Sequence, residues 1–108
     1  MADIEDTGIS AVGGIDRLIH EPARLMIVAI LYVVESADFT FVMVQSGLTW
    51  GNLSSHMTKL EDAGYIRCKK EFKGRMPRTI YTLSAAGRKA LNNYISHMEA
   101  LITTMKNN

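Results

Sequence analysis

One stretch of the chain, LTWGNLSSHMTKLEDAGYI starting at Leu48, constrains the fold most, because it carries the start and stop signals of a single helix. Thr49 is a strong N-cap candidate, and Leu48 and Leu53 occupy the two positions of a hydrophobic staple. Gly64 stands where helices commonly end in a left-handed glycine. These signals predict a helix over residues 50–63.

The segment before this helix predicts two further helices. Pro22 fits a first helical position, and the run PARLMIVAILYVVES that it opens is apolar almost all round. A helix without a polar face needs neighbours on every side, so we expect this one at the centre of the core. FTFVMVQSG predicts a shorter helix ending at Gly47, and a tight turn at Gly47–Leu48 then gives a helix-turn-helix.

The residues after Gly64 predict a basic β-hairpin. YIRCKKEF and TIYTL have strand character on either side of the loop KGRMPR, which is too long for a two-residue turn. Five cationic side chains fall within ten residues of this segment, at Lys69, Lys70, Lys73, Arg75 and Arg78. A helix-turn-helix followed by a basic hairpin is the pattern of a winged helix, with the two-stranded hairpin as its wing.

A long amphipathic helix is expected after Ser84, its predicted N-cap. Residues 85–106 would span ~30 Å, which is longer than so small a domain can cover. Its apolar positions step by three and four, at Leu91, Tyr94, Ile95, Met98, Leu101, Ile102 and Met105. Such a stripe needs a partner, and an isologous pairing of two copies is the simplest arrangement.

The predicted fold class is therefore α+β, mainly α: a winged helix-turn-helix with a two-stranded wing and a long C-terminal dimerisation helix. We expect three segments, which are a flexible arm over residues 1–14, the winged-helix domain over residues 15–84 and the dimerisation helix over residues 85–108.

Composition places the chain among single-domain intracellular proteins. Its 108 residues suit one domain, and 47% hydrophobic against 21% charged residues is an ordinary globular balance. One cysteine, Cys68, excludes an internal disulfide and fits a reducing cytoplasm. The acidic N-terminal sequence lacks a secretion-signal pattern, and the longest apolar run is shorter than the ~20 residues that a bilayer needs. We expect a cytoplasmic protein without membrane contact.

The net charge of +1 conceals an uneven distribution. Residues 1–58 carry two basic and seven acidic side chains, whereas residues 59–89 carry nine basic and three acidic ones. Such polarity is typical of chains that bind a polyanion or an acidic surface, although many charge runs are only solvated faces.

The outward face of the 50–63 helix is built from small hydrogen-bonding residues. With Leu53, Met57 and Leu60 inward, a 3.6-residue period turns outward Gly51, Ser54, Ser55, Thr58 and Asp62, with Asn52 and Lys59 on the flanks. Ordinary solvated helix faces are rich in Glu, Lys and Gln, which are better helix formers than Ser, Thr and Asn. The composition favours a surface made for contact, on a helix slim enough to enter a major groove.

From about His20 to Leu91 the chain resembles the small bacterial and archaeal winged-helix transcriptional regulators of the MarR/ArsR type. The matching stretches are HEPARLMIVAIL, LTWGNLSSHMTKLEDAGYI and PRTIYTLSAAGRKAL. The resemblance implies a homodimer that binds double-stranded DNA, with recognition helices in successive major grooves. It places the base-reading positions on Asn52, Ser54, Ser55 and Thr58, and the wing contacts on Lys73, Arg75 and Arg78.

We therefore expect a sequence-specific DNA-binding transcriptional regulator that acts as a homodimer on a pseudo-palindromic duplex site. The expected DNA-backbone contacts are Thr49, Lys59, Lys69, Lys73, Arg75 and Arg78. The alternative is a winged helix used as a protein-interaction module, whose basic wing docks on an acidic partner. Trp50 has two interpretations, contact with sugar and phosphate or packing within the helix entry, of which packing is slightly favoured.

Catalysis and metal binding are not expected. His20, His56, His97 and Cys68 lack the spacing of metal ligands, and no cofactor is predicted. No nucleophile motif, phosphate loop or dinucleotide fingerprint is present, so an enzyme is not expected. The sequence does not identify a small-molecule effector, the operator, or the choice between activation and repression.

Overall fold

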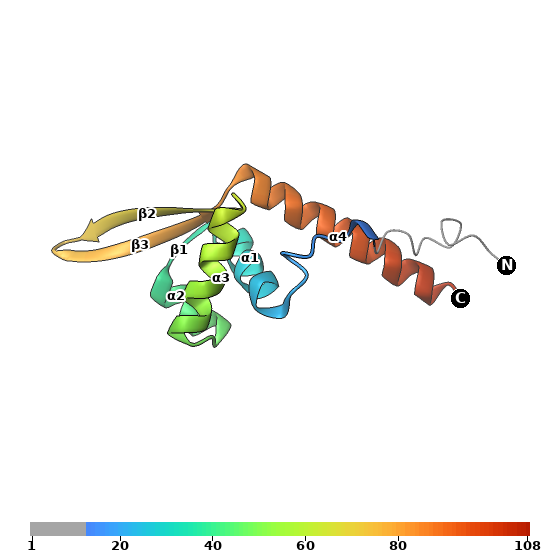
Figure 1. The fold of residues 1–108 in the computed structure, drawn as a ribbon, viewed down its shortest axis with the longest axis horizontal. Coiled ribbons are helices and arrows are strands. Elements are labelled where there is room, and N and C mark those ends of the chain that lie inside the picture. Colours follow the sequence, from blue (N-terminus) through green and yellow to red (C-terminus); the bar gives the residue numbers. More distant parts are fainter. Residues whose placement is uncertain (1–12) are drawn as a thin grey trace.

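The computed structural model describes residues 13–108, so the predicted arm lies almost entirely outside the described residues. Figure 1 shows a helical body from which a long hairpin extends on one side and a long helix on the other. In chain order the elements are α1 (Pro22–Val34), β1 (Ser36–Asp38), α2 (Phe39–Ser46), α3 (Trp50–Asp62), β2 (Ile66–Lys73), β3 (Met76–Leu83) and α4 (Ala85–Lys106).

The predicted N-caps are confirmed. The Thr49 hydroxyl accepts a hydrogen bond from the Asn52 amide at 3.2 Å, and the Ser84 hydroxyl accepts one from the Gly87 amide at 3.0 Å. Each oxygen satisfies an amide that has no partner inside its own helix. Helices α3 and α4 therefore begin where the sequence signals place them.

The predicted end of α3 is also confirmed. Gly64 has φ of +79°, a left-handed conformation that glycine adopts without strain. Its amide donates to the Glu61 carbonyl and the Tyr65 amide donates to the Leu60 carbonyl, both at 2.9 Å. This pair of bonds is the Schellman motif, which turns the chain directly from α3 into β2.

The sheet has three antiparallel strands rather than the two predicted, in the order β1-β3-β2. Strand β1 pairs with the root of β3 through Ser36 and Thr82, Ala37 and Tyr81, and Asp38 and Ile80. Three residues between two helices carry no alternating pattern, so local sequence could not predict β1. Pairing with β3 creates this strand.

The wing turn is shorter than predicted. Lys73 pairs with Met76, which leaves Gly74 and Arg75 as a two-residue turn, and Gly74 has φ of +63° at its first position. The expectation of a longer loop is wrong because Pro77 belongs to β3. Proline is tolerated there because β1 pairs with β3 only from Ile80 to Thr82, so no strand lies beyond Pro77 on that side.

Helix α1 lies in the core but is not surrounded. Ile27, Val28 and Leu31 are fully buried, whereas Met26 and Val33 are exposed. Helices α2, α3 and α4 and strand β3 pack against it and leave one apolar side open. Within one protomer the expectation of neighbours on every side is wrong, because the few elements of this domain cannot enclose a whole helix.

Helix α4 contributes its first half to the same core. Leu91 and Tyr94 are buried, and Met98 packs against the cluster together with Ile15 and Leu18 from the segment before α1. In Figure 1 the rest of α4 continues away from the domain, opposite to the wing. Within residues 13–108 no helix is long and apolar enough to cross a bilayer.

Candidate nucleic-acid interface

The exposed face of α3 carries most of the predicted base-contacting residues. Asn52, Ser55 and Thr58 are exposed, as the helical period required, but Ser54 is half-buried. The Thr58 hydroxyl donates to the Ser54 carbonyl at 3.0 Å, so its hydrogen is already engaged within the helix. Ser55 and Asn52 are therefore the side chains on this face best placed to read a base edge.

Thr49 and Lys59 lie at the two ends of this exposed face. Thr49 is exposed while its oxygen caps α3, and its hydroxyl hydrogen remains available for a phosphate oxygen. Lys59 is exposed in the last turn of α3, where a cation also complements the helix dipole.

The pairing register divides the wing side chains between two faces. Directly opposed residues of an antiparallel pair share a face, and successive residues alternate. Lys70 pairs with Thr79, two positions from Tyr81, which packs against Phe39 beside α3. Lys70 is therefore on the face that looks toward α3, whereas Lys69, paired with Ile80, is on the opposite face.

Lys69 was predicted as a DNA-backbone contact and Lys70 was not. The register favours Lys70 for a strand of DNA that also touches α3. Counting alternate residues outward from the buried Ile66 would have found this from the sequence, because Ile66, Cys68 and Lys70 share one face.

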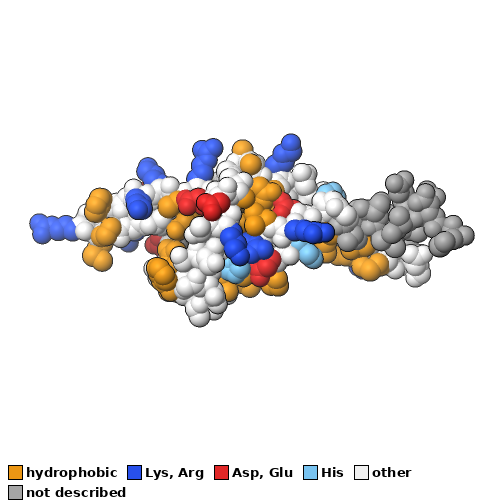
Figure 2. All heavy atoms as spheres, in the orientation of Figure 1, with side chains coloured by type: hydrophobic (Ala, Val, Ile, Leu, Met, Phe, Trp, Pro, Cys, Tyr) orange, Lys and Arg blue, Asp and Glu red, His pale blue; other side chains and the backbone are white. Residues whose placement is uncertain are grey.

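The turn of the wing carries exposed cationic side chains, whereas its paired strands also carry an ion pair. Lys73 and Arg75 are exposed at the turn. Arg78, by contrast, bonds Glu71 on the neighbouring strand, with distances of 2.9 Å from Nε and 2.8 Å from Nη2 to the same carboxylate oxygen. Figure 2 shows Lys and Arg side chains projecting along the whole wing. The predicted Arg78–phosphate contact would require Arg78 to leave or share Glu71.

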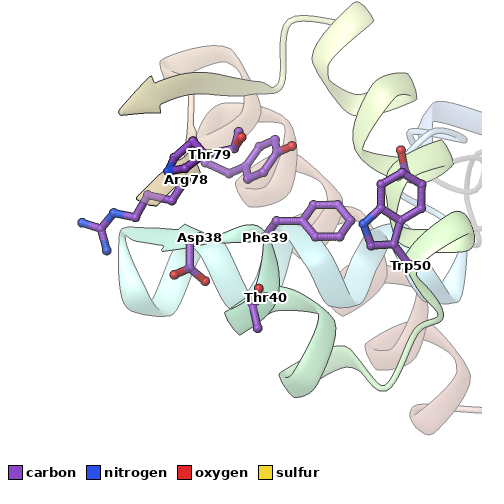
Figure 3. Close-up of a pocket in the computed structure, with 9 residues that line it drawn as sticks. Asp38, Phe39, Thr40, Trp50, Arg78 and Thr79 are labelled. Atoms are coloured by element: carbon purple, nitrogen blue, oxygen red, sulfur yellow. The ribbon is translucent and has the colours of Figure 1, made fainter. Parts of the chain in front are cut away.

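A groove of about 380 Å³ separates the wing from the start of α3. Figure 3 shows the Phe39 and Trp50 side chains next to each other in its lining, while the Arg78 side chain points away. The ring centroids of Phe39 and Trp50 are 5.8 Å apart, and those of Phe39 and Tyr81 are 6.3 Å apart. Burial raises the pKa of Tyr81 to about 12, helped by the neighbouring Cys68 and Glu61, so its hydroxyl stays protonated at neutral pH.

Trp50 is compatible with both predicted roles, packing at the helix entry and contact with sugar and phosphate. Its ring packs against Phe39, yet 66% of the residue remains exposed at the mouth of the groove. Packing therefore fixes the ring orientation while most of its surface stays open to a ligand.

The predicted dimer residues divide into two groups. Leu91 and Tyr94 are buried in the core of their own protomer, so the expectation that they meet a partner chain is wrong. The segment that leads into α1 covers them, and His20 Nδ1 lies 2.8 Å from the Tyr94 hydroxyl. The residues left exposed or half-exposed along α4 are Ile95, Met98, Leu101, Ile102 and Met105.

His56 and Cys68 lie apart from each other, on α3 and on the wing. His56 Nδ1 lies 3.2 Å from an Arg24 guanidinium nitrogen, and Cys68 is exposed on the wing. No three His, Cys, Asp or Glu side chains gather into a metal-binding group anywhere in residues 13–108.

A family model described as a winged helix DNA-binding domain matches residues 23–102, from the start of α1 to near the end of α4. The chain therefore belongs to this family of winged-helix DNA-binding domains. The family is a non-enzymatic one, as the sequence predicted.

Two individual proteins resemble the chain over most of its length. The uncharacterised protein MJ0432 of Methanocaldococcus jannaschii is 38% identical over 80 residues, which cover 73% of this chain and 86% of that protein. A transcriptional regulator homologue from Pyrococcus horikoshii OT3 superposes with a TM-score of 0.83 at 28% identity, over 89% of this chain and 97% of the other.

More distant structures share the fold. NadR in complex with 4-hydroxyphenylacetate gives a TM-score of 0.69 at 17% identity, over 99% of this chain and 81% of that one. A MarR-family transcriptional regulator from Silicibacter pomeroyi gives 0.60 at 15% identity, over 96% and 67%. The predicted resemblance to winged-helix regulators is confirmed.

Proposed function

We propose that this protein is a sequence-specific transcriptional regulator that binds double-stranded DNA as a homodimer. The observation that carries the proposal is the juxtaposition of the polar face of α3 with the basic wing. Ser55 and Asn52 on α3 would read base edges in the major groove, and Lys70, Lys73 and Arg75 would neutralise phosphates. The P. horikoshii protein, described as a transcriptional regulator homologue, supports a regulatory role.

The homodimer is inferred from apolar surface that the protomer leaves open. Ile95, Ile102 and Met105 are exposed along α4, and Met26 and Val33 are exposed on α1. Apolar side chains in such number on a small domain favour association. An isologous pairing would repeat the recognition helix at about one DNA turn, ~34–36 Å, so the site would be pseudo-palindromic.

The experiment that tests this proposal is selection from random duplexes with purified protein, followed by titration of the selected and scrambled duplexes over a salt series. A DNA-binding protein should enrich a two-fold symmetric consensus, and log affinity should fall linearly with log salt. The scrambled duplex serves as the matched control. An unenriched pool together with salt-insensitive binding would favour the protein-interaction alternative, with an acidic partner for the wing.

A further inference from the structure

We propose that the tip of the wing is a minor-groove wedge, in which Phe72 enters between base pairs while neighbouring cations hold the phosphates. The inference rests on the proposed function, because it states how the wing of a DNA-binding winged helix meets its duplex. It adds an apolar, sequence-sensitive contact to a wing whose predicted DNA contacts are all cationic side chains.

The tip carries large apolar side chains that the fold does not use. Phe72 is 73% exposed and Met76 is 70% exposed, and both lie outside the hydrophobic core and the residues packed against it. Figure 2 shows hydrophobic side chains at the far end of the wing, among Lys and Arg side chains. A solvated turn needs no such groups, and exposing them in the free protein is unfavourable.

The register places these groups on both faces of a narrow ribbon. Phe72 pairs with Pro77 and shares its face, which is the one that looks toward α3. Met76 pairs with Lys73 on the other face, one step nearer the turn. The wing therefore ends in a two-stranded tip that carries at least one large apolar side chain on each face and closes with a two-residue turn.

A continuous surface connects Phe72 with the recognition helix. The groove beside Trp50 and a second hollow of about 550 Å³ around Phe72 share Pro77, Arg78 and Thr79 in their linings. A DNA strand that presents its major-groove edge to α3 and runs along this surface would reach Phe72 at the adjacent minor groove.

The positive charge around the tip favours DNA over a protein as its partner. Lys70, Lys73 and Arg75 are exposed beside Phe72 and Met76. Protein–protein interface cores are depleted in lysine and bury ~800 Å² on each partner, which two side chains among free cations do not offer. Phe, Met and Pro flanked by Arg and Lys are the residues that proteins use to wedge open minor-groove base steps.

The test compares Phe72→Ala and Phe72→Leu with the unaltered protein on the duplex obtained by selection. Binding is measured by gel shift over a salt series, and bending by circular permutation of the site in the same fragment. Arg75→Ala is the matched control for charge, and a thermal melt checks folding. Because Phe72 is mostly exposed, neither variant should lower the melting temperature.

We expect the unaltered protein to bend its site by ~20° or more, which is the low end for minor-groove wedges. Phe72→Ala should weaken binding roughly tenfold and reduce the bend, with an unchanged salt slope because no charge is lost. Phe72→Leu should keep most of both, since leucine is also a wedge residue. Arg75→Ala should lower the salt slope by about one unit and leave most of the bend.

Three results would overturn the wedge while leaving the proposed function standing. These are an unbent site, a Phe72→Ala protein with full affinity and bend, and a loss of affinity without a change of bend. An effect of Phe72→Ala on sedimentation rather than on DNA would assign Phe72 to a protein contact and also overturn it. Failure of the unaltered protein to bind any duplex would instead refute the proposed function.

Discussion

Gly87 of α4 lies directly against the backbone of Tyr65, at the turn between α3 and β2. A Cβ atom at Gly87 would lie 2.0 Å from the Tyr65 carbonyl oxygen and 2.8 Å from its carbonyl carbon. The same carbonyl accepts a hydrogen bond from the Ser84 amide at 3.0 Å, and the Ser84 hydroxyl donates to the Gly64 carbonyl. The end of α3, the start of the wing and the start of α4 are thus joined at one place (Figure 1).

Gly87→Ala should be strongly destabilising. The added methyl group meets backbone atoms rather than a flexible side chain, so α4 or the α3–β2 turn must move. We expect a loss of about 3 kcal/mol in the free energy of unfolding, at the upper end for overpacking. Denaturant unfolding measures the loss, and Ala86→Ser, an exposed neighbour in the same helix turn, is the control and should change stability by less than ~0.5 kcal/mol. Equal stabilities of the two variants would contradict the close approach.

Glu21 should stabilise the protein only above acidic pH. Its carboxylate caps α1 by accepting a bond from the Arg24 amide at 2.8 Å. This bond, together with the Ala23 amide and the charges of His56 and Arg24, outweighs partial burial and lowers the pKa of Glu21 from the ordinary 4.5.

A pKa that is lower in the folded state means that protonation favours unfolding. The stabilisation is therefore present above pH 4.5 and is lost as the pH falls through the lower, folded pKa. Glu21→Ala should lose about 1 kcal/mol at pH 7, and the difference should shrink below about pH 4. Urea unfolding of both proteins across this range measures it, with Glu99→Ala as the control for an exposed carboxylate. A pH-independent difference would mean that the charge does not contribute.

Lys70 and Lys69 are adjacent in sequence but lie on opposite faces of the wing, which makes them a matched pair. Lys70→Ala should lower the magnitude of the salt slope of DNA binding by about one unit, because its face looks toward α3. Lys69→Ala removes the same charge from the other face and should change the slope less. Gel-shift titrations over a salt series compare them. A larger effect at Lys69 would place the DNA on the other side of the wing, and equal slopes would mean that the DNA does not distinguish the two faces.

Ser55→Ala should relax base preference more than Thr58→Ala does. The Thr58 hydroxyl already donates its hydrogen to the Ser54 carbonyl, so it offers a base only an acceptor, whereas Ser55 is exposed and can offer both. A good base contact is worth ~1–3 kcal/mol of discrimination. Repeating the duplex selection with each variant measures the change, and Ser96→Ala on α4 is the control. A consensus unchanged in both α3 variants would remove this face from base reading.

Ile102→Glu should dissociate the proposed dimer without unfolding the protomer. Ile102 is 40% exposed on the distal half of α4, so a charge there is tolerated in water but not in an apolar interface. Thr103→Glu, one residue away and also exposed, is the control. Sedimentation of the three proteins, with a gel shift of each, tests the expectation that the dimer and tight DNA binding are lost together. Truncation before Tyr94 is a poorer test, because Tyr94 belongs to the protomer core. A monomeric unaltered protein would contradict the dimer.

The sequence by itself determined the helices and their ends. Thr49 and Ser84 cap amides, and Gly64 turns the chain, within a few residues of their own positions. These effects are local, so the helix ends can be predicted from the sequence. The basic wing and the polar face of α3 could also be predicted, because residue type and helical period determine them. From these features the order of the helices and the wing, the winged-helix class and most candidate DNA contacts could be predicted.

The tertiary structure decided what depends on pairing between distant segments. Strand β1 exists because β3 lies beside it, and the register of β2 with β3 sets the short turn and separates Lys70 from Lys69. Leu91 and Tyr94 were assigned to a dimer because helical spacing gives one apolar stripe and does not say which half the chain itself covers. Residues 15–20 cover that half, and the open sides of α1 and α4 follow from how few elements the domain has to surround them.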